Sequence, residues 1–443
     1  MKEFGKTVCK IAIPVTLQSM LQSSFSIVDQ LMIGQLGENS IAAVGLCGNF
    51  SLIFSVIMGA IGTVAGIIIA QFIGAKDEKE AWRGFTVSTI FGALVAGIFM
   101  FASLLFAGQI LGLYTEDSNT ILAGVPYFRI IAFTFIPMAI STIVATWLRC
   151  NDHATIPLVA SFAAVICNTG LNYILIFGKL GVAPLGVKGA GYATVVSQII
   201  NLCLMIIGLC FYLRKEHKRI LLSVRLQKIS IGEYLVMLTP LLISEFLWSL
   251  GQNINSAVFG HIGTDSLAAY MLTTPIQGLF TGALSGLSAA AGVIIGKHLG
   301  KKDFDAAYGD SKKLLWLGLA GSVILSVVLF LLAGFYVTNY QVDAFVKETA
   351  KYLLFVFAVY APVKVLNMIL GGGIIRSGGD TKIIMIIDII GTWLVGIPLC
   401  LLTAYVLGLS VVPVYAIFSF EEVVRLVITL VVFQKKSWMH SIS

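Results

Sequence analysis

Long apolar runs separated by short polar stretches make up most of the chain. The runs are about 20–25 residues long, which is enough to cross a hydrocarbon core of about 30 Å. Because a backbone in lipid must satisfy its own hydrogen bonds, each run is predicted to be a helix. The twelve predicted transmembrane spans are 11–33, 43–70, 85–107, 121–147, 156–178, 190–213, 233–259, 267–296, 313–338, 349–374, 383–407 and 411–433.

The pattern of polar, Gly and Pro residues between the apolar runs occurs twice, about 226 residues apart. P-V-T-L-Q-S from Pro14 returns as P-L-L-I-S-E from Pro240, and F-I-G-A-K-D-E-K-E-A from Phe72 returns as H-L-G-K-K-D-F-D-A-A from His298. Two copies of one helical bundle are how many secondary transporters are built. Further matched pairs are Gly34 with Gly260, Gly37 with Gly263 and, after a slip of one residue, Arg149 with Arg376.

Composition and charge support a membrane protein. Hydrophobic residues make up 58% of the chain and charged residues 12%, whereas soluble proteins average about 25% charged. Most of the 29 Lys and Arg residues lie at the termini and in the loops after even-numbered spans. The positive-inside rule therefore predicts that both termini are cytoplasmic. The net charge of +7 is interpreted as a topology signal, and no nucleic-acid partner is expected.

These observations predict an all-α integral membrane fold in the cell inner (plasma) membrane. An even number of spans per repeat gives both halves the same orientation, so two six-helix lobes would be related by a pseudo-twofold axis along the membrane normal. The predicted lobes are 1–213 and 233–443, joined by a basic cytoplasmic loop at 214–232. Seven cysteines without a C-x-x-C pair indicate no disulfide framework.

Polar side chains recur at helical spacing inside several spans. Gln18 and Asp29 lie on one face of the first span, about three turns apart. Glu245 and Gln252 lie within span seven, and Gln277 lies within span eight. Polar groups that face lipid are costly, so these faces are expected to point into the bundle. They would form either hydrogen bonds between helices or the wall of a water-filled cavity.

Two carboxylates are the strongest functional candidates, because an ionised side chain at mid-membrane costs at least about 2.5 kcal/mol. Asp29 lies near the outer end of its span and could instead reach the membrane surface. Glu245 could instead be a structural partner of Lys364 or Arg129.

The last two spans carry further charges for which a structural interpretation is favoured. Glu421 and Arg425 are four residues apart and are expected to neutralise each other on one helix face. Asp388 lies near the cytoplasmic end of span eleven and is expected to reach water.

Enzyme signatures are absent from the sequence. It contains neither a G-x-x-x-x-G-K-[ST] phosphate loop nor an H-E-x-x-H metal motif. G-G-G-I-I-R-S-G-G-D, from Gly371 to Asp380, is better explained as a turn that ends a helix than as a phosphate cradle. The chain is expected to be no enzyme and to need no cofactor.

Several longer motifs together resemble one family over essentially the whole chain. They are S-I-V-D-Q-L-M-I-G-Q-L-G in span one, Q-F-I-G-A-K-D after span two, L-R-C-N-D-H-A-T after span four, and N-T-G-L-N-Y-I-L-I-F-G with L-G-V-K-G-A-G-Y-A-T between Asn168 and Thr194. The chain is similar to bacterial antiporters of the multidrug and toxic compound extrusion (MATE) family. The resemblance implies two six-helix lobes and the export of cationic or amphipathic small molecules in exchange for sodium ions or protons, by a monomer in the lipid bilayer.

The resemblance also implies a cation-coupling site in the N-terminal lobe. Asp29 matches the span-one carboxylate, and Asn172 falls where many members carry a second Asp. Such a site could bind sodium through Asp29, Asn168, Asn172 and Thr194, or it could carry a proton on the single carboxylate. The matched positions are Asp29, Asn168, Asn172, Thr194 and the backbone carbonyl of Ala190.

The C-terminal lobe differs from the family pattern and from the first repeat. Glu245 matches the span-seven Glu of many members, but the Asp that some relatives carry in span ten, near Val365, is missing. Asp29 aligns with Asn255 in the repeat, so coupling is expected to rest mainly on the N-terminal lobe. The predicted residues of a substrate cavity in the C-terminal lobe are Glu245, Gln252, Gln277 and Asn367.

Two other functions remain possible from the sequence. A flippase for lipid-linked saccharides, from the same broad superfamily, would need a more cationic cavity to hold pyrophosphate. A passive pore or a membrane-embedded enzyme would need no coupling ion, and the enzyme would need a catalytic cluster that the sequence lacks. The exported compound cannot be deduced from the sequence.

Overall fold

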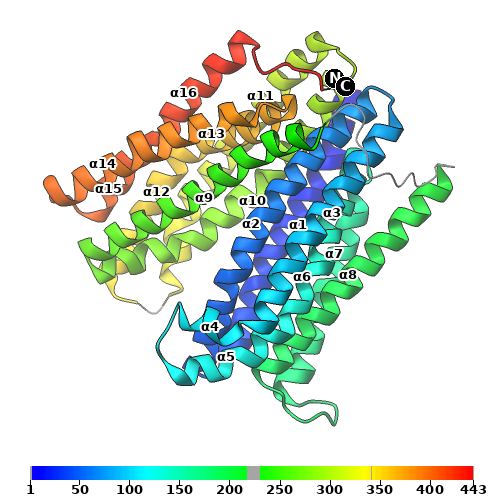
Figure 1. Cartoon of the computed structure of the whole chain (residues 1–443). Coiled ribbons are helices and arrows are strands. Elements are labelled where there is room, and N and C mark those ends of the chain that lie inside the picture. The colour runs from blue at the N-terminus through cyan, green and yellow to red at the C-terminus, as the bar shows by residue number, and fades with distance from the viewer. Residues whose placement is uncertain (1, 217–229, 341, 443) are drawn as a thin grey trace. The chain divides into compact units, whose positions relative to one another are not determined.

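The computed structural model describes residues 2–216, 230–340 and 342–442, which are mostly helical and contain no strand (Figure 1). The first half contains α1 (Lys2–Gly34), α2 (Glu38–Gly74), α3 (Glu78–Leu105), α4 (Ala107–Gly112), α5 (Ser118–Ile131), the short η1 (Ala132–Thr134), α6 (Phe135–Cys150), α7 (Thr155–Phe177) and α8 (Val187–Lys215). The second half contains α9 (Ile231–Ile262), α10 (Thr264–Gly300), α11 (Phe304–Thr338), α12 (Ala344–Asn367), η2 (Met368–Ile375), η3 (Arg376–Gly378), α13 (Thr381–Ile389), η4 (Ile390–Gly396), α14 (Ile397–Leu401), η5 (Leu402–Val406), α15 (Val411–Phe418) and α16 (Phe420–Lys435).

Ten helical segments of the described chain are long and apolar enough to cross a membrane. Some of them join several elements, such as the span Ser118–Cys150 built from α5, η1 and α6. Helix α1 and the pair α15–α16 complete the twelve predicted spans. The predicted all-α membrane fold, with six spans in each half of the chain, is therefore confirmed.

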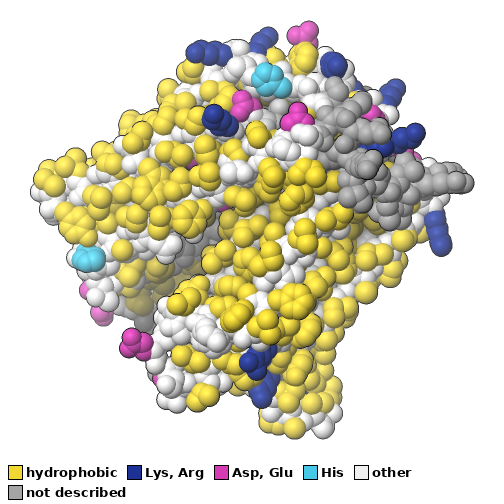
Figure 2. Space-filling model, in the orientation of Figure 1, with side chains coloured by type: hydrophobic (Ala, Val, Ile, Leu, Met, Phe, Trp, Pro, Cys, Tyr) yellow, Lys and Arg dark blue, Asp and Glu magenta, His cyan; other side chains and the backbone are white. Residues whose placement is uncertain are grey.

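The surface of the helices suits a hydrocarbon environment. Large apolar side chains on α11 are mostly exposed, including Trp316 at 71%, Leu331 at 74% and Phe335 at 72%. The face shown in Figure 2 is largely hydrophobic, and its Lys and Arg side chains lie toward the ends of the helices. Apolar exposure on this scale marks a lipid-facing surface, because lipid rather than water is the favourable neighbour of such side chains.

The repeat is also visible in the local structure of two helix starts. Asp77 and Asp303 each cap the next helix by accepting a hydrogen bond from the backbone N–H three residues later, at 3.2 and 3.1 Å. The residues before them, Lys76 and Lys302, both have left-handed backbone, with φ of 61° and 60°. A side chain oxygen that satisfies an otherwise unpaired N–H defines where a helix begins. Both copies of the motif thus use the same turn.

Contacts divide the chain into two compact units. The N-terminal unit contains Leu17–Ile69 and the chain from Asp77 through α8. The C-terminal unit contains the chain from α9 onward, together with Ala70–Lys76 and the part of α1 that ends at Thr16. Residues 217–229 of the predicted loop 214–232 lie outside the described residues, and the predicted lobe boundaries stay a prediction.

Two repeat-related glycines bring helix ends together in the C-terminal unit. A Cβ on Gly74, at the end of α2, would overlap the backbone of Lys297. A Cβ on Gly300, at the end of α10, would overlap the backbone of Gln71. Small residues at membrane helix crossings allow this backbone-to-backbone approach. The two glycines therefore set the distance between the last turn of α2, after Ile69, and the end of α10.

The C-terminal half contains π-helical turns that the sequence pattern did not predict. They form η2, η4 and η5, within spans ten and eleven. Turns of this kind are often found at functional sites. The predicted helix-ending turn is confirmed: η3 ends at Gly378, Gly379 has a φ of +84°, and the Asp380 side chain caps α13.

The glycine crossing makes a first prediction. Gly300→Ala is expected to lower the free energy of unfolding by about 1–3 kcal/mol, because the added methyl group forces the backbones apart. Gly309→Ala is the matched control, since a Cβ on Gly309 meets no atom within 4 Å. The measurement is thermal unfolding of the purified protein in detergent. Equal unfolding temperatures for the two variants would show that the crossing tolerates a side chain.

Candidate functional site

The structure joins the five predicted residues of the first site in one hydrogen-bonded chain across α1, α7 and α8. Asn172 Nδ2 donates to Asp29 Oδ1 at 2.6 Å and to Asn168 Oδ1 at 2.8 Å. Asn168 Nδ2 donates in turn to Thr194 Oγ1 at 3.3 Å. Thr194 Oγ1 donates to the Ala190 carbonyl at 2.9 Å. Residues far apart in sequence thus form one polar cluster.

A sixth residue, Ser197, belongs to this cluster and was not predicted. Its Oγ accepts a hydrogen bond from Asn168 Nδ2 at 3.2 Å and donates to the backbone carbonyl of Thr194 at 2.9 Å. Ser197 is 3% exposed. Its position three residues after Thr194, and so on the same helix face, is the signal that could have found it.

The cluster combines one carboxylate with several neutral oxygens. Asn172 is fully buried, and its Oδ1 accepts no hydrogen bond within the described part of the chain. Because its Nδ2 donates to a carboxylate, the amide orientation is fixed by Asp29. A buried hydrogen-bond acceptor that receives no hydrogen bond costs free energy unless another partner satisfies it. Asn172 Oδ1 is therefore available to a cation, and hard cations prefer oxygen ligands of this kind.

A polar cavity of about 240 Å³ lies in the same unit. It is bounded by Asn168 and Ser197 of the cluster and also by Arg149. Arg149 Nη2 donates to Gln18 Oε1 at 2.8 Å, and Gln18 Nε2 donates to Ser161 Oγ at 2.7 Å. The polar face of α1 thus both bonds to neighbouring helices and lines a cavity. Other lining residues are Gln22, Ser141, Thr142, Gln198 and Asn201.

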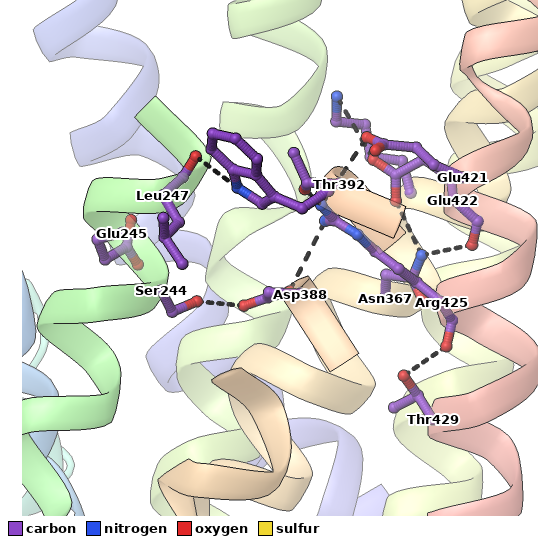
Figure 3. Close-up of polar contacts among 12 residues, drawn as sticks. Ser244, Glu245, Leu247, Asn367, Asp388, Thr392, Glu421, Glu422, Arg425 and Thr429 are labelled. Atoms are coloured by element: carbon purple, nitrogen blue, oxygen red, sulfur yellow. Dashed lines mark hydrogen bonds and ion pairs between the residues drawn. The ribbon is translucent and has the colours of Figure 1, made fainter. Parts of the chain in front are cut away.

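The C-terminal unit contains a cluster of five charged side chains, here called the charge cluster (Figure 3). Arg425 Nη2 lies 3.8 Å from Glu421 Oε1, and Arg425 Nη1 lies 3.7 Å from Asp388 Oδ1. Lys364 Nζ lies 3.8 Å from Glu422 Oε1. The predicted neutralisation between Glu421 and Arg425 is confirmed by this ion pair.

The expectation that Asp388 reaches water stays a prediction, and the structure gives this carboxylate two partners inside the C-terminal unit. Asp388 accepts a hydrogen bond from Ser244 of α9 and faces Arg425 of α16, as Figure 3 shows. Its side chain is only 25% exposed. A guanidinium and a hydroxyl thus both face this carboxylate.

Glu245 has a different partner from the two that the sequence suggested. Its Oε1 lies 3.8 Å from Arg376 Nη2, whereas Lys364 pairs with Glu422. The alternative in which Lys364 pairs with Glu245 is therefore wrong, whereas the alternative with Arg129, which belongs to the other unit, stays a prediction. The spacing along the chain could not show this, because η2 and η3 place Arg376 opposite α9.

The same contacts recur in both halves with different chemistry. Gln18 donates to Ser161 in the first half, and Ser244 donates to Asp388 in the second. Arg149 reaches Gln18 in α1, and its counterpart Arg376 reaches α9. The acceptor Ser161 of the first copy thus corresponds to the carboxylate Asp388 of the second. The partner of the arginine changes from the neutral Gln18 to the carboxylate of Glu245.

The four predicted cavity residues of the C-terminal unit line two cavities. Glu245 and Asn367 line one of about 300 Å³. Gln252 and Gln277 line another of about 290 Å³. Asn367 Nδ2 donates to Glu422 Oε2 at 2.8 Å. Residues common to both cavities are Trp248, Thr281, Lys364 and Glu422, and the second cavity also has Tyr270, Phe357, Tyr360, Tyr415 and Phe418 in its wall.

The repeat position of Asp29 is not a second carboxylate site. It is occupied by Asn255, which is 2% exposed and whose amide atoms have no hydrogen-bond partner among the described residues. Groups of three or more metal-binding His, Cys, Asp or Glu side chains are also absent from the described ranges. The two halves of the chain therefore offer chemically different sites.

A duplicated helical membrane fold with polar cavities in each unit is the architecture of a secondary transporter. A family model described as MatE matches residues 14–174 and 240–402. The two matches begin at Pro14 and Pro240, which confirms the internal repeat. Because they cover more than half of the chain, it belongs to the MatE family of multidrug and toxic compound extrusion transporters.

Relatives match the chain over nearly its full length. It is 26% identical to the uncharacterized transporter YisQ of Bacillus subtilis, over 93% of this chain and 90% of that protein. It is 22% identical to a probable multidrug resistance protein, NorM, of Thermotoga maritima, over 98% of this chain and 93% of that protein.

Solved structures share the fold. The Vibrio cholerae MATE transporter VcmN in its bent form superposes with a TM-score of 0.87 at 17% identity, over 98% of this chain and 97% of that chain. A MATE in complex with MaL6 gives a TM-score of 0.87 at 17% identity, over 98% and 96% of the two chains. At this identity the likeness shows the fold alone.

The hydrogen-bonded cluster makes a second prediction. Asn168→Leu is expected to lower the free energy of unfolding by about 1–3 kcal/mol, because Asn172 Nδ2 and Ser197 Oγ each lose one of their two hydrogen-bond partners in a buried site. Asn253→Leu is the control, since Asn253 is exposed and bonds only to its own helix. Thermal unfolding in detergent is the measurement. A loss no greater than that of the control would mean that the cluster does not stabilise the unit.

Proposed function

We propose that this protein is an antiporter that exports cationic or amphipathic small molecules by alternating access, driven by a gradient of sodium ions or protons. Membership of the MatE family and relatives named as multidrug resistance proteins support export of small molecules. In this proposal the protein is a monomer of the plasma membrane with both termini in the cytoplasm, as the distribution of Lys and Arg favours.

The observation that carries the proposal is the cluster around Asp29. A single carboxylate, the free oxygen of Asn172 and the oxygens of Asn168 and Thr194 lie along one hydrogen-bonded chain. Carboxylate, amide and hydroxyl oxygens are suitable ligands for sodium. In other transporters, backbone carbonyls of unwound helix segments also coordinate the coupling ion. A proton on Asp29 would neutralise the same charge. In either case, one cation balances one carboxylate.

Coupling follows from the charge of Asp29. An ion can drive the change between two conformations of a transporter only if it binds the two conformations with different affinity. Asn172 and Asn168 come from α7, Asp29 from α1 and Thr194 from α8. A cation bound among them therefore favours the arrangement in which these helices lie together, and cation release favours their separation. Substrate binding to the other arrangement would complete the exchange.

The cavities of the C-terminal unit suit an amphipathic cation better than a pyrophosphate. Six aromatic side chains line the cavity of about 290 Å³, and aromatic faces attract organic cations. Each basic side chain that lines the other cavity, of about 300 Å³, has a carboxylate partner. Lys364 pairs with Glu422, Arg376 with Glu245, and Arg425 with Asp388. No excess positive charge remains there for an anionic headgroup, which favours the antiporter over a lipid-linked saccharide flippase.

Neutralising the coupling carboxylate tests the proposal. Asp29→Asn is expected to abolish dye export from everted vesicles while the protein stays folded, because the variant can bind neither the coupling sodium ion nor the proton. Glu116→Gln, an exposed loop carboxylate, is the control and should export like the unmodified protein. Gradient-dependent export by Asp29→Asn would overturn the assignment.

Glu245 provides a separate test of substrate recognition. Glu245→Gln is expected to weaken the export of cationic dyes much more than that of neutral dyes, because it removes a negative charge from the wall of a cavity. The measurement compares initial export rates of one dye of each class at equal expression.

A structural role for Glu245 has a different signature. Removing it would leave Arg376 unpaired, lower the expression of the protein, and be partly rescued by Arg376→Met. Equal export of both dye classes by a well-expressed Glu245→Gln protein would rule out the substrate role.

A further inference from the structure

The charge cluster of the C-terminal unit has an imbalance between acids and bases. Three carboxylates, Asp388, Glu421 and Glu422, face two bases, Lys364 and Arg425. With every group ionised, the cluster carries one excess negative charge inside a membrane protein. An unpaired charge in such an environment costs free energy and is normally neutralised by a partner of opposite charge or by a change of protonation.

The three carboxylates differ in how well they are solvated by the protein. Asp388 accepts a hydrogen bond from Ser244, and Glu422 accepts one from Asn367 at 2.8 Å. Glu421 has only the distant ion pair with Arg425 at 3.8 Å. Its residue is 4% exposed, and its Oε2 accepts no hydrogen bond among the residues that the structure describes. Glu421 is therefore the carboxyl group with the least support for a negative charge.

The backbone around Glu421 is shaped to admit this side chain. A Cβ on Gly396 would overlap Glu421 Oε2, and a Cβ on Gly391 would overlap the Arg425 side chain. Both glycines belong to the π-helical segment η4. Irregular turns of this kind are over-represented at functional sites. The helix that faces α16 thus leaves space for a buried carboxyl group and for its basic neighbour.

The site adjoins a cavity of the C-terminal unit. Glu421 lines the cavity of about 290 Å³ together with Lys364 and the aromatic side chains described above. A proton needs only one carboxyl oxygen, whereas the described residues contain no group of three or more His, Cys, Asp or Glu side chains that could hold a metal ion. The titratable and charged groups around Glu421 and its cavity are Tyr270 of α10, Tyr360 and Lys364 of α12, Asp388 of α13, Cys400 of α14, Tyr415 of α15, and Glu422 and Arg425 of α16.

We propose that Glu421 is a proton-binding site of the C-terminal unit and that its proton competes with a cationic substrate in the adjoining cavity. Protonated Glu421 makes the charge cluster neutral. When an organic cation enters the aromatic cavity, the carboxyl O–H bond breaks, the proton passes to water in the cavity, and the cation balances the carboxylate. This competition rests on the proposed export of cations, and it gives the C-terminal unit an exchange site of its own, separate from Asp29.

Proton release on ligand binding tests the proposal without any transport. The purified full chain in detergent and weak buffer is mixed with tetraphenylphosphonium, and released protons and bound cation are both measured. About one proton per bound cation is expected for the unmodified protein, by linkage between the two ligands. Glu421→Gln should bind the cation but release no proton, and Glu421→Asp should restore release.

Controls locate the source of the proton. Glu348→Gln alters an exposed carboxyl group and should release protons normally. Undiminished release by Glu421→Gln, or absence of cation binding to the unmodified protein, would each overturn the proposal. Vesicle export is measured separately, so failure of this competition leaves the proposed antiport to be judged by its own assay.

Discussion

A hydrocarbon environment offers no hydrogen-bond partners, and most of this structure follows from that constraint. The backbone satisfies itself in helices, and the polar side chains must find partners in one another. Asp29 finds Asn172, and Arg425 lies between two carboxylates. Polar groups that must be sequestered from lipid gather in a few places, and those places are where an ion or a charged substrate could bind. The chemistry of transport and the stability of the fold thus depend on the same contacts.

Duplication supplies one scaffold with two chemistries. The caps at Asp77 and Asp303 have the same geometry in both copies. The polar contacts inside the units have diverged, because Ser161 of the first copy corresponds to Asp388 of the second, and each accepts a hydrogen bond from the first helix of its copy. A single carboxylate among neutral oxygens suits a coupling ion. A cluster with several charges and aromatic neighbours suits a larger cation that must bind and leave.

The sequence was sufficient to predict the twelve spans, the repeat and five residues that the structure joins in one polar cluster. Hydrophobic run length determines a membrane helix, whereas the role of the cluster as a cation site stays a proposal. Contacts between helices that are distant in the sequence were harder to predict. The contact of Glu245 with Arg376 and that of Asp388 with Arg425 each join different helices of the C-terminal unit. Local periodicity contains no information about such pairings, and Ser197 was missed although its spacing from Thr194 could have indicated it.

The most direct test of the account is dye export from everted vesicles under separately imposed ion gradients. A sodium gradient is applied without a pH difference, and a pH difference is applied at equal sodium concentrations on both sides. The account predicts that at least one gradient drives export and that an ionophore that collapses this gradient stops it. Export that continues unchanged without either gradient would contradict a cation-coupled mechanism based on Asp29.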